Sequence, residues 1–314
     1  MRSFLRFLLV FICLQLLSPQ LLTAQDFRVA YNVYDTVRKD YEIYVMNADG
    51  SGKKNITNVK AVDWTYYAFG KRLFFISDRD TCSRCFFLYE MDPEGGSLRR
   101  ISDLQLEDSW MDSRMEGREM VVTGRVGKDI RQQLFLLNTE DGSYRRLTSD
   151  TGAYYNDPVF IKGGEQVVFR HRKNRRDRNE KAELWVMNPD GSGMKQLTSF
   201  PATDTSAPWH AYHAGAPRWN ARYGFISFQS IRNGQYHLFS IRPDGSGLRQ
   251  LTAGGNEGWH DWSRDGRWLV ADAAGAVPSD YDIVLYKYGR KLKFVRRLSG
   301  RGDWKAEYAP VVLQ

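Results

Sequence analysis

The chain has 314 residues, of which 42% are hydrophobic and 14% are aromatic, and its formal net charge is +8. This composition excludes an intrinsically disordered chain because it supplies ample apolar material for a core, and its aromatic content favours strands over helices. The modest positive charge is compatible with an acidic partner but carries no information about the fold.

Residues 1–24 are a predicted signal peptide. Arg2 and Arg6 provide its positive segment, residues 7–17 form an apolar stretch, and a small-residue cleavage site follows. The apolar stretch is too short to span a bilayer, and no later segment is apolar enough to do so. We therefore expect a periplasmic or secreted protein with a single domain over residues 25–314 and no transmembrane segment after signal cleavage.

The cysteines indicate a local disulfide. Of the three, Cys13 lies in the predicted signal peptide, which leaves only Cys82 and Cys85 in the mature chain. In an exported protein, two cysteines this close together favour a structural bridge that closes a small loop over catalytic thiol exchange.

One sequence unit recurs along the rest of the chain. Its clearest copies are Tyr-Glu-Ile-Tyr-Val-Met-Asn-Ala-Asp-Gly-Ser-Gly at 41–52, Glu-Leu-Trp-Val-Met-Asn-Pro-Asp-Gly-Ser-Gly at 183–193 and His-Leu-Phe-Ser-Ile-Arg-Pro-Asp-Gly-Ser-Gly at 237–247. Weaker copies lie at 87–96, 134–143 and 283–289. The turn glycine falls at positions 50, 95, 142, 191, 245 and 289, a spacing of 44 to 54 residues that is close to that of a propeller blade.

Each unit is predicted to contain four antiparallel strands. An alternating strand, an Asp-Gly turn and a short strand ending in Leu-Thr form an outer hairpin, since glycine tolerates the positive φ of such a turn. Apolar runs of strand length precede it at residues 71–77, 119–124, 166–170, 223–229 and 268–271. Such a sheet must stack on its neighbours, and a closed ring removes exposed ends. We therefore predict an all-β, six-bladed β-propeller of four-stranded antiparallel blades.

The two chain ends are predicted to meet in the first blade. The first unit begins with a second strand at residues 28–33, so its innermost strand is missing on the N-terminal side. Residues 307–313, Glu-Tyr-Ala-Pro-Val-Val-Leu, match the inner strand of the fourth unit at residues 155–161, Tyr-Asn-Asp-Pro-Val-Phe-Ile. We expect residues 309–313 to complete the first blade.

These units resemble the TolB-type propeller repeat. The match rests on residues 262–267, Trp-Ser-Arg-Asp-Gly-Arg, and on the three Asp-Gly-Ser-Gly hairpins, and it covers nearly the whole mature chain. The resemblance implies a six-bladed propeller in the periplasm or outside the cell, whose loops around a central channel are offered to partners. It extends only to the propeller part of TolB, because TolB has a further N-terminal α/β domain and the repeats here begin directly after the predicted signal peptide.

Candidate ligand-binding residues lie where the chain enters the innermost strands, and we expect them at one mouth of the channel. They are Asp63, Trp64, Trp110, Asp112, Asn156, Asp157, Arg218, Trp259, His260, Asp261 and Glu307. The fifth unit adds an enlarged loop, residues 209–217, which carries Trp209, His210 and His213 and is unusual for a connector. Trp209 and Trp259 are suited to stack on a sugar or a peptide. The alternative is that the polar groups only cap blade ends and bind channel water.

No catalytic motif accompanies these residues. The chain has no Gly-x-Ser-x-Gly elbow, no His-Glu-x-x-His and no phosphate-binding glycine loop. We therefore expect a non-catalytic scaffold without a cofactor, which binds an envelope protein or an acidic glycan and, being exported, no nucleic acid. The arginine-rich residues 170–178 are either a solvated loop or a contact to such a glycan.

The rival hypothesis is a metal-dependent polysaccharide lyase. In it, His210, His213 and His260 bind a divalent transition metal, for which imidazole is a suitable ligand. Oligogalacturonate lyases are propellers of related repeat type with a histidine-bound metal in the channel mouth, and a resemblance to them implies such a site. The sequence departs from that pattern because the dense histidine cluster before the Ser-x-Asp-Gly turn is reduced to His260.

Overall fold

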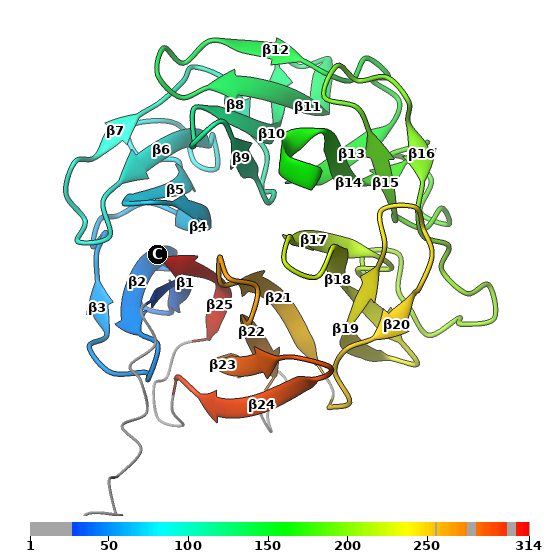
Figure 1. Ribbon diagram of the computed structural model, residues 1–314. Helices are drawn as coiled ribbons and strands as arrows, with labels where there is room; N and C mark the ends of the chain where they lie inside the picture. Colours follow the sequence, from blue (N-terminus) through cyan, green and yellow to red (C-terminus); the bar gives the residue numbers. More distant parts are fainter. Residues whose placement is uncertain (1–26, 255, 275–280, 300–305, 314) are drawn as a thin grey trace, which may run out of the picture.

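The computed structural model describes residues 27–254, 256–274, 281–299 and 306–313. Over these residues the chain forms β-sheets that follow one another around a ring (Figure 1), and the predicted six-bladed β-propeller is confirmed. The predicted signal peptide falls outside the described residues. Within the described part of the chain, no helix is long and apolar enough to cross a membrane.

Each blade runs from an innermost strand at the channel to a short strand at the rim. The first blade contains β25 (Glu307–Leu313), β1 (Arg28–Asp35), β2 (Asp40–Asn47) and β3 (Lys54–Asn55), and the second contains β4 (Asp63–Phe69), β5 (Arg72–Ser77), β6 (Phe87–Met91) and β7 (Arg99–Arg100). The fourth contains β13 (Tyr154–Ile161), β14 (Gln166–Arg172), β15 (Glu183–Met187) and β16 (Lys195–Gln196), with the short 3-10 helix η1 (Lys162–Gly164) after β13. The fifth contains β17 (Gly215–Asn220), β18 (Phe225–Arg232), β19 (Gln235–Ile241) and β20 (Arg249–Gln250), and the sixth contains β21 (Glu257–Trp262), β22 (Trp268–Ala274), β23 (Tyr281–Tyr288) and β24 (Leu292–Arg297).

The third blade differs because its innermost strand is divided. Its order from the rim is β12 (Tyr144–Arg146), β11 (Ile130–Asn138) and β10 (Glu119–Val126), and β10 then pairs with both β8 (Gln105–Leu106) and β9 (Asp112–Arg114). Leu106 also forms a bridge to Phe86 of the preceding blade. The segment between β8 and β9, residues 107–111, leaves the ladder and lines the channel.

The outer Asp-Gly turns pack against the backbone of the preceding blade. Gly50 has a φ of +89°, and a Cβ at this position would lie 2.4 Å from the carbonyl oxygen of Leu298 in the sixth blade. Gly191 has a φ of +90°, and its Cβ would lie 2.4 Å from the carbonyl oxygen of Leu147. Glycine is therefore required here both by the backbone conformation and by the closeness of the neighbouring blade.

The threonine of the Leu-Thr pair satisfies a backbone donor of the third strand. In the fourth blade, Thr198 Oγ1 accepts the Leu184 N–H at 2.9 Å and donates to Glu183 Oε2 at 2.6 Å. Because the rim strand of this blade, β16, has only two residues, this side-chain bond extends the pairing of a short edge. The repeated Leu-Thr pair therefore has a structural role in fixing the rim.

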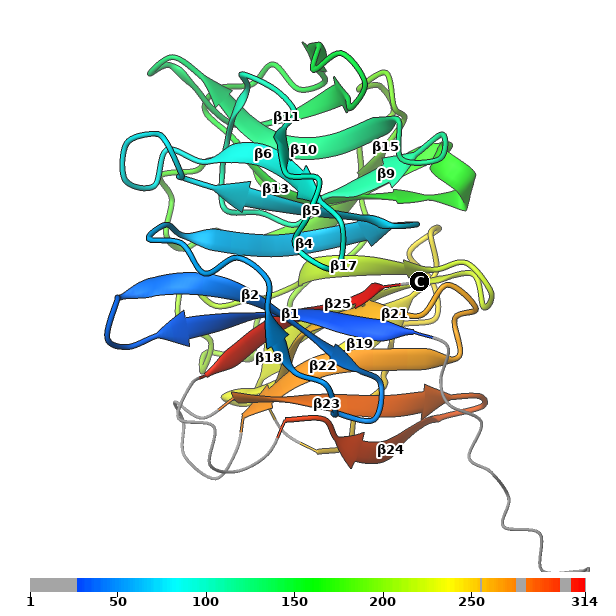
Figure 2. The same ribbon diagram turned by 90° about the vertical axis from the view of Figure 1, so that its left-hand side faces the viewer.

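The C-terminal strand closes the ring as predicted. β25 pairs antiparallel with β1, and Figure 2 shows it running between β1 and β21. Two carboxylates of the sixth blade hold the same strand, because Asp261 Oδ2 accepts the Val312 N–H and Asp272 Oδ2 accepts the Ala309 N–H, each at 2.9 Å. β25, called the clasp strand below, thus connects the first blade to the last.

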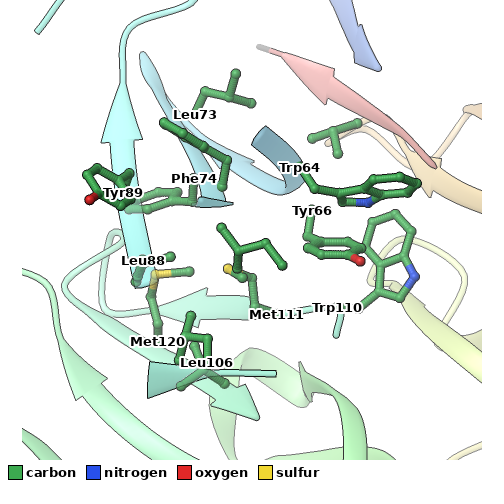
Figure 3. Packing of buried hydrophobic residues seen from close by; sticks show 14 of the residues in the cluster. Trp64, Tyr66, Leu73, Phe74, Leu88, Tyr89, Leu106, Trp110, Met111 and Met120 are labelled. Atoms are coloured by element: carbon green, nitrogen blue, oxygen red, sulfur yellow. The ribbon is translucent and has the colours of Figure 1, made fainter. Parts of the chain in front are cut away.

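Apolar side chains fill the space between adjacent blades. Phe74 and Leu88 of the second blade lie in one cluster with Met120 of the third, and all three are fully buried (Figure 3). A second cluster joins Leu285 of the sixth blade to Val29 of the first. Each sheet therefore buries its two faces against its neighbours, which is the packing that the repeat predicts.

Candidate functional site

The described residues form two pockets in the channel, one at each end. The N-side pocket, where the innermost strands begin, has a volume of about 370 Å³, and the C-side pocket, where they finish, has a volume of about 410 Å³. Between them, the guanidinium carbon of Arg218 lies 3.5 Å from the ring centre of Trp110. Trp110 lines only the N-side pocket and Arg218 only the C-side pocket. This stacked pair therefore forms the partition between the two pockets.

Aromatic side chains from all six blades form the wall of the N-side pocket: Tyr41, Trp64, Tyr66, Phe86, Trp110, Tyr154, Tyr212 and Trp259. The ring centre of Trp64 lies 4.5 Å from that of Tyr41, 6.0 Å from that of Tyr66 and 5.9 Å from that of Trp259. Trp64, Tyr66 and Trp110 lie next to one another and are buried (Figure 3). Tyr41 and Trp259 keep part of their surface exposed, so they provide open ring surface to a ligand.

Asn156 and Asp157 line the N-side pocket, at a bulge in β13 where Asp157 has a φ of 54°. Asp157 Oδ1 accepts the Trp110 N–H at 3.1 Å, and its Oδ2 lies 3.3 Å from Arg170 Nε. The Arg170 guanidinium lies over the Tyr212 ring at 4.3 Å. The bulge thus aims the Asp157 carboxylate at two partners within the protein, and it joins the third blade to the fourth.

Three charged lining residues were absent from the sequence prediction: Arg84, Glu107 and Asp108. Asp108 Oδ1 accepts a hydrogen bond from the Tyr66 hydroxyl. Enclosure by the pocket walls raises the pKa of Asp108, and burial raises the pKa of Tyr66 well above its usual value. Residues 78–86 and 107–111 are irregular loop segments outside the repeated strands, so the repeat gave no signal for these residues.

Asp112, Arg218 and Asp261 line the C-side pocket, so the expectation that all candidates share one mouth is wrong for them. Asp112 and Asp261 come two positions after Trp110 and Trp259 in the chain, so they lie further along the channel, towards the ends of the innermost strands. Arg218 Nε lies 3.3 Å from Asp261 Oδ1. Burial raises the pKa of Asp112 to about 7.

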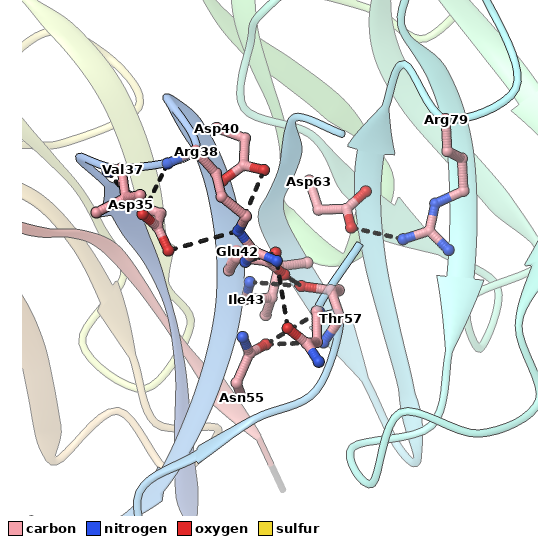
Figure 4. Close-up of polar contacts among 11 residues, drawn as sticks. Asp35, Val37, Arg38, Asp40, Glu42, Ile43, Asn55, Thr57, Asp63 and Arg79 are labelled. Atoms are coloured by element: carbon pink, nitrogen blue, oxygen red, sulfur yellow. Dashed lines mark hydrogen bonds and ion pairs between the residues drawn. The ribbon is translucent and has the colours of Figure 1, made fainter. Parts of the chain in front are cut away.

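Asp63 and Glu307 line neither pocket. Asp63 is buried and accepts a hydrogen bond from Arg79 at 2.6 Å within the second blade (Figure 4). Burial raises its pKa, and the Arg79 charge opposes that rise. Glu307 is buried with its Oε1 3.8 Å from Lys53 Nζ. Both carboxylates therefore serve the packing of the blades.

The three histidines proposed as metal ligands are not brought together. The part of the chain that the structure describes contains no cluster of three or more His, Cys, Asp or Glu side chains that could hold a metal ion. His260 is buried, with its Nε2 2.7 Å from Ser227 Oγ. His213 is buried edge-to-face against Phe200 at 4.9 Å, and burial lowers its pKa to about 4. His210 is exposed at the surface.

The enlarged loop of the fifth unit contributes Tyr212 to the N-side pocket instead of the residues expected from the sequence. Trp209 is 46% exposed, lies 4.8 Å from the Arg178 guanidinium and lines neither pocket. The Tyr212 hydroxyl accepts the Trp259 Nε1–H at 3.3 Å. The loop therefore completes the aromatic wall, and Trp209 lies outside it.

Known proteins resemble this chain over part of its length. No family model matches the chain. It is 34% identical over 120 residues to dipeptidyl-peptidase 5 of Porphyromonas endodontalis, a match that covers 37% of this chain and 16% of that protein. It is 31% identical over 126 residues to the Tol-Pal system protein TolB of Anaeromyxobacter dehalogenans, over 39% of this chain and 26% of that protein. The chain thus spans about a quarter or less of the length of these relatives.

Solved structures resemble the whole ring. TolB from Acinetobacter baumannii superposes with a TM-score of 0.69 at 12% identity, over 91% of this chain and 66% of that one. An oligogalacturonate lyase in complex with manganese gives 0.55 at 15% identity, over 82% of this chain and 71% of that one. At such identities the likeness shows the fold alone. The resemblance to a TolB-type propeller is thus confirmed for the repeat and the fold.

Proposed function

We propose that this TolB-like six-bladed propeller is an exported, non-catalytic binding scaffold that holds a protein or carbohydrate partner in its N-side pocket. The observation that carries the proposal is the pocket itself, where rings from all six blades enclose about 370 Å³. A pocket of this size that combines aromatic walls with polar groups is typical of ligand sites. Edge-to-face contacts among the rings hold the wall in place before a ligand arrives.

The polar groups of the pocket support binding over catalysis. Two of the three carboxylates of the lining, Asp157 and Glu107, are paired with Arg170 and Arg131. The Ser109 hydroxyl lies 2.9 Å from Thr123 Oγ1 and accepts the Asp157 N–H at 2.8 Å, so it takes part in blade packing. A metal-dependent lyase is not proposed, since His210, His213 and His260 occupy separate positions.

Export and a role in the cell envelope belong to the same proposal. They rest on the predicted signal peptide and on the likeness to a Tol-Pal system protein. An envelope protein or an acidic glycan is the partner that these observations favour. N-terminal sequencing of protein from the periplasmic fraction should give a start near Gln25. A chain that begins at Met1 and stays in the cytoplasm would contradict the proposal.

The Trp259→Ala variant tests the pocket directly. Immobilised wild-type protein is used to select a partner from periplasmic extract and from a glycan array, and the affinity of that partner is then measured for each variant. Loss of the Trp259 ring should weaken binding by at least about ten-fold. The matched control is Phe294→Ala, which removes a ring that is 60% exposed on β24 and should bind as the wild type does. Equal affinities in all three proteins would exclude the N-side pocket as the site.

A further inference from the structure

The charges of the N-side pocket are paired, with two exceptions. Asp157 is paired with Arg170 at 3.3 Å, and Glu107 Oε1 lies 3.8 Å from Arg131 and 4.0 Å from Arg125. Among the described residues, no cation lies within 4.0 Å of the Asp108 carboxylate, and no carboxylate lies within 4.0 Å of the Arg84 guanidinium. Asp108 and Arg84 are therefore the two charged groups of the lining that make no ion pair within 4.0 Å, and the Arg84 charge acts on the Asp108 carboxylate across the pocket.

The Asp108 carboxylate lines the same pocket as the part-exposed ring of Tyr41. It is exposed, and among the described residues the Tyr66 hydroxyl donates the hydrogen bond to it. Burial raises the pKa of Tyr41, the partly exposed ring that packs on Trp64 at 4.5 Å, and the Arg84 and Asp108 charges act on that pKa in opposite directions. A carboxylate beside accessible aromatic surface is the arrangement that binds an ammonium group, through an ion pair together with a cation–π contact.

Arg84 is held at the pocket by a constrained loop. The predicted disulfide between Cys82 and Cys85 is present and brackets Arg84. Asp78 Oδ2 accepts the Arg84 N–H at 2.8 Å, and Arg84 has a φ of 57°, an unusual conformation for a residue with a side chain. Thr81 Oγ1 donates to the Cys85 carbonyl at 2.9 Å, which closes the loop. The loop thus fixes the backbone from which the Arg84 side chain reaches the pocket.

We propose that the N-side pocket recognises a short zwitterionic peptide, whose free ammonium group binds Asp108 and the adjacent rings and whose carboxylate binds Arg84. This inference rests on the proposed function and names the ligand class of the same site. A ligand with a single charge would leave the other protein charge desolvated and unpaired, which is costly. Only a ligand that carries both charges satisfies both groups.

The limited accessibility of the aromatic ring faces favours a peptide over an oligosaccharide as the ligand. A pyranose ring needs an open aromatic face on which to stack. The central rings lack one, because Trp64 is stacked with Tyr308 at 6.1 Å and Trp110 is covered by Arg218 at 3.5 Å. Both tryptophans are buried. Tyr154 and Tyr212 are also partly exposed, but the Arg170 guanidinium lies over both rings. Tyr41 and Trp259 remain, which suits an ammonium group and one apolar side chain.

Three forms of one tripeptide test the inference by isothermal titration calorimetry at pH 7. They are Ala-Phe-Glu with free ends, its N-acetylated form, and the free-amine form in which both carboxylates are replaced by amides. We expect the wild-type protein to bind the zwitterion at least about ten-fold more tightly than either modified form, as is typical of hydrogen bonds to charged groups.

Two variants assign each charge to its partner. Asp108→Asn should lose the discrimination against the acetylated peptide and keep the discrimination against the amide. Arg84→Gln should do the reverse. The controls are Asp80→Asn, an exposed acid on the same loop, and Arg290→Gln, an exposed cation after β23, and both should behave as the wild type does.

The outcomes separate this inference from the proposed function. If the wild-type protein binds all three forms equally, or none of them, or if Asp108→Asn weakens all three alike, the inference is overturned. If an uncharged ligand or tetragalacturonate then binds with an affinity that Trp259→Ala reduces, the N-side pocket still functions as a binding site and only its assignment to zwitterionic peptides fails.

Discussion

Replacing Val311 by alanine tests how strongly the clasp strand holds the ring. Val311 is fully buried in β25, and alanine removes two methyl-sized groups. At about 0.8 kcal/mol for each group, plus the cost of the cavity, the change amounts to about 2 to 3 kcal/mol. A cost of about 2 kcal/mol is a factor of about 30 in an opening equilibrium. Because this cost falls on the strand that joins the chain ends, β25 and β1 should open together while the other blades stay closed.

Hydrogen–deuterium exchange read by mass spectrometry measures that opening. Peptides covering residues 28–35 and 307–313 should exchange about 30-fold faster in Val311→Ala than in the wild-type protein. The control is Val168→Ala, which removes the same groups from an equally buried position in β14 and should leave exchange of these peptides unchanged. The clasp reasoning is refuted if both variants accelerate exchange of the chain ends equally, or if neither does.

The left-handed φ of Arg84 costs about 1 kcal/mol because this residue has a Cβ. Arg84→Gly should therefore raise the melting temperature by about 2 °C, and a melting temperature below that of the wild-type protein would exclude strain at this position. Burial lowers the pKa of His213 to about 4 in the folded protein, below the value of about 6.5 expected in the unfolded chain. As the pH falls from about 6.5 to about 4, the unfolded chain therefore binds a proton that the folded protein does not, and the stability should decrease. Melting temperatures across this range should decline less steeply in His213→Phe, and parallel declines would contradict the prediction. Gly50 and Gly245 have φ values of +89° and +90°, but a Cβ would lie 2.4 Å from the neighbouring backbone oxygen at Gly50 and 3.5 Å at Gly245. Urea unfolding should therefore show Gly50→Ala to be at least about 1 kcal/mol more destabilising than Gly245→Ala, and equal losses would show that the blade contact has no energetic role.

The repeat predicted the fold because its residues act within one turn or between adjacent blades. Asp49 Oδ1 accepts the Ser51 N–H at 2.9 Å inside a turn, and Gly50 is required by the same turn, so a few consecutive residues carry the signal. The divided inner strand of the third blade was not predicted. It depends on the bridge between Leu106 and Phe86 of another blade, which no local pattern encodes.

The candidate site was predictable only in part. Trp64 and Trp259 lie in inner strands and Trp110 lies in the break of the divided one, and all three line the N-side pocket. The alternation along a strand indicates which side chains face the channel, but it does not indicate where along the channel Arg218 and Trp110 divide it. Some of the candidates therefore line the C-side pocket instead of the N-side pocket. Arg84 and Asp108 lie in loops outside the repeat, and only the folded ring brings these loops to the same pocket.

The stacked side chains of Arg218 and Trp110 restrict how a long polymer can bind in the channel. A tunnel open from end to end lets a filament thread through it, whereas a blocked one admits only what stops inside or bends back. A polymer that enters the N-side pocket must therefore bind through its end or through a bend. The chemical groups of that end then determine recognition.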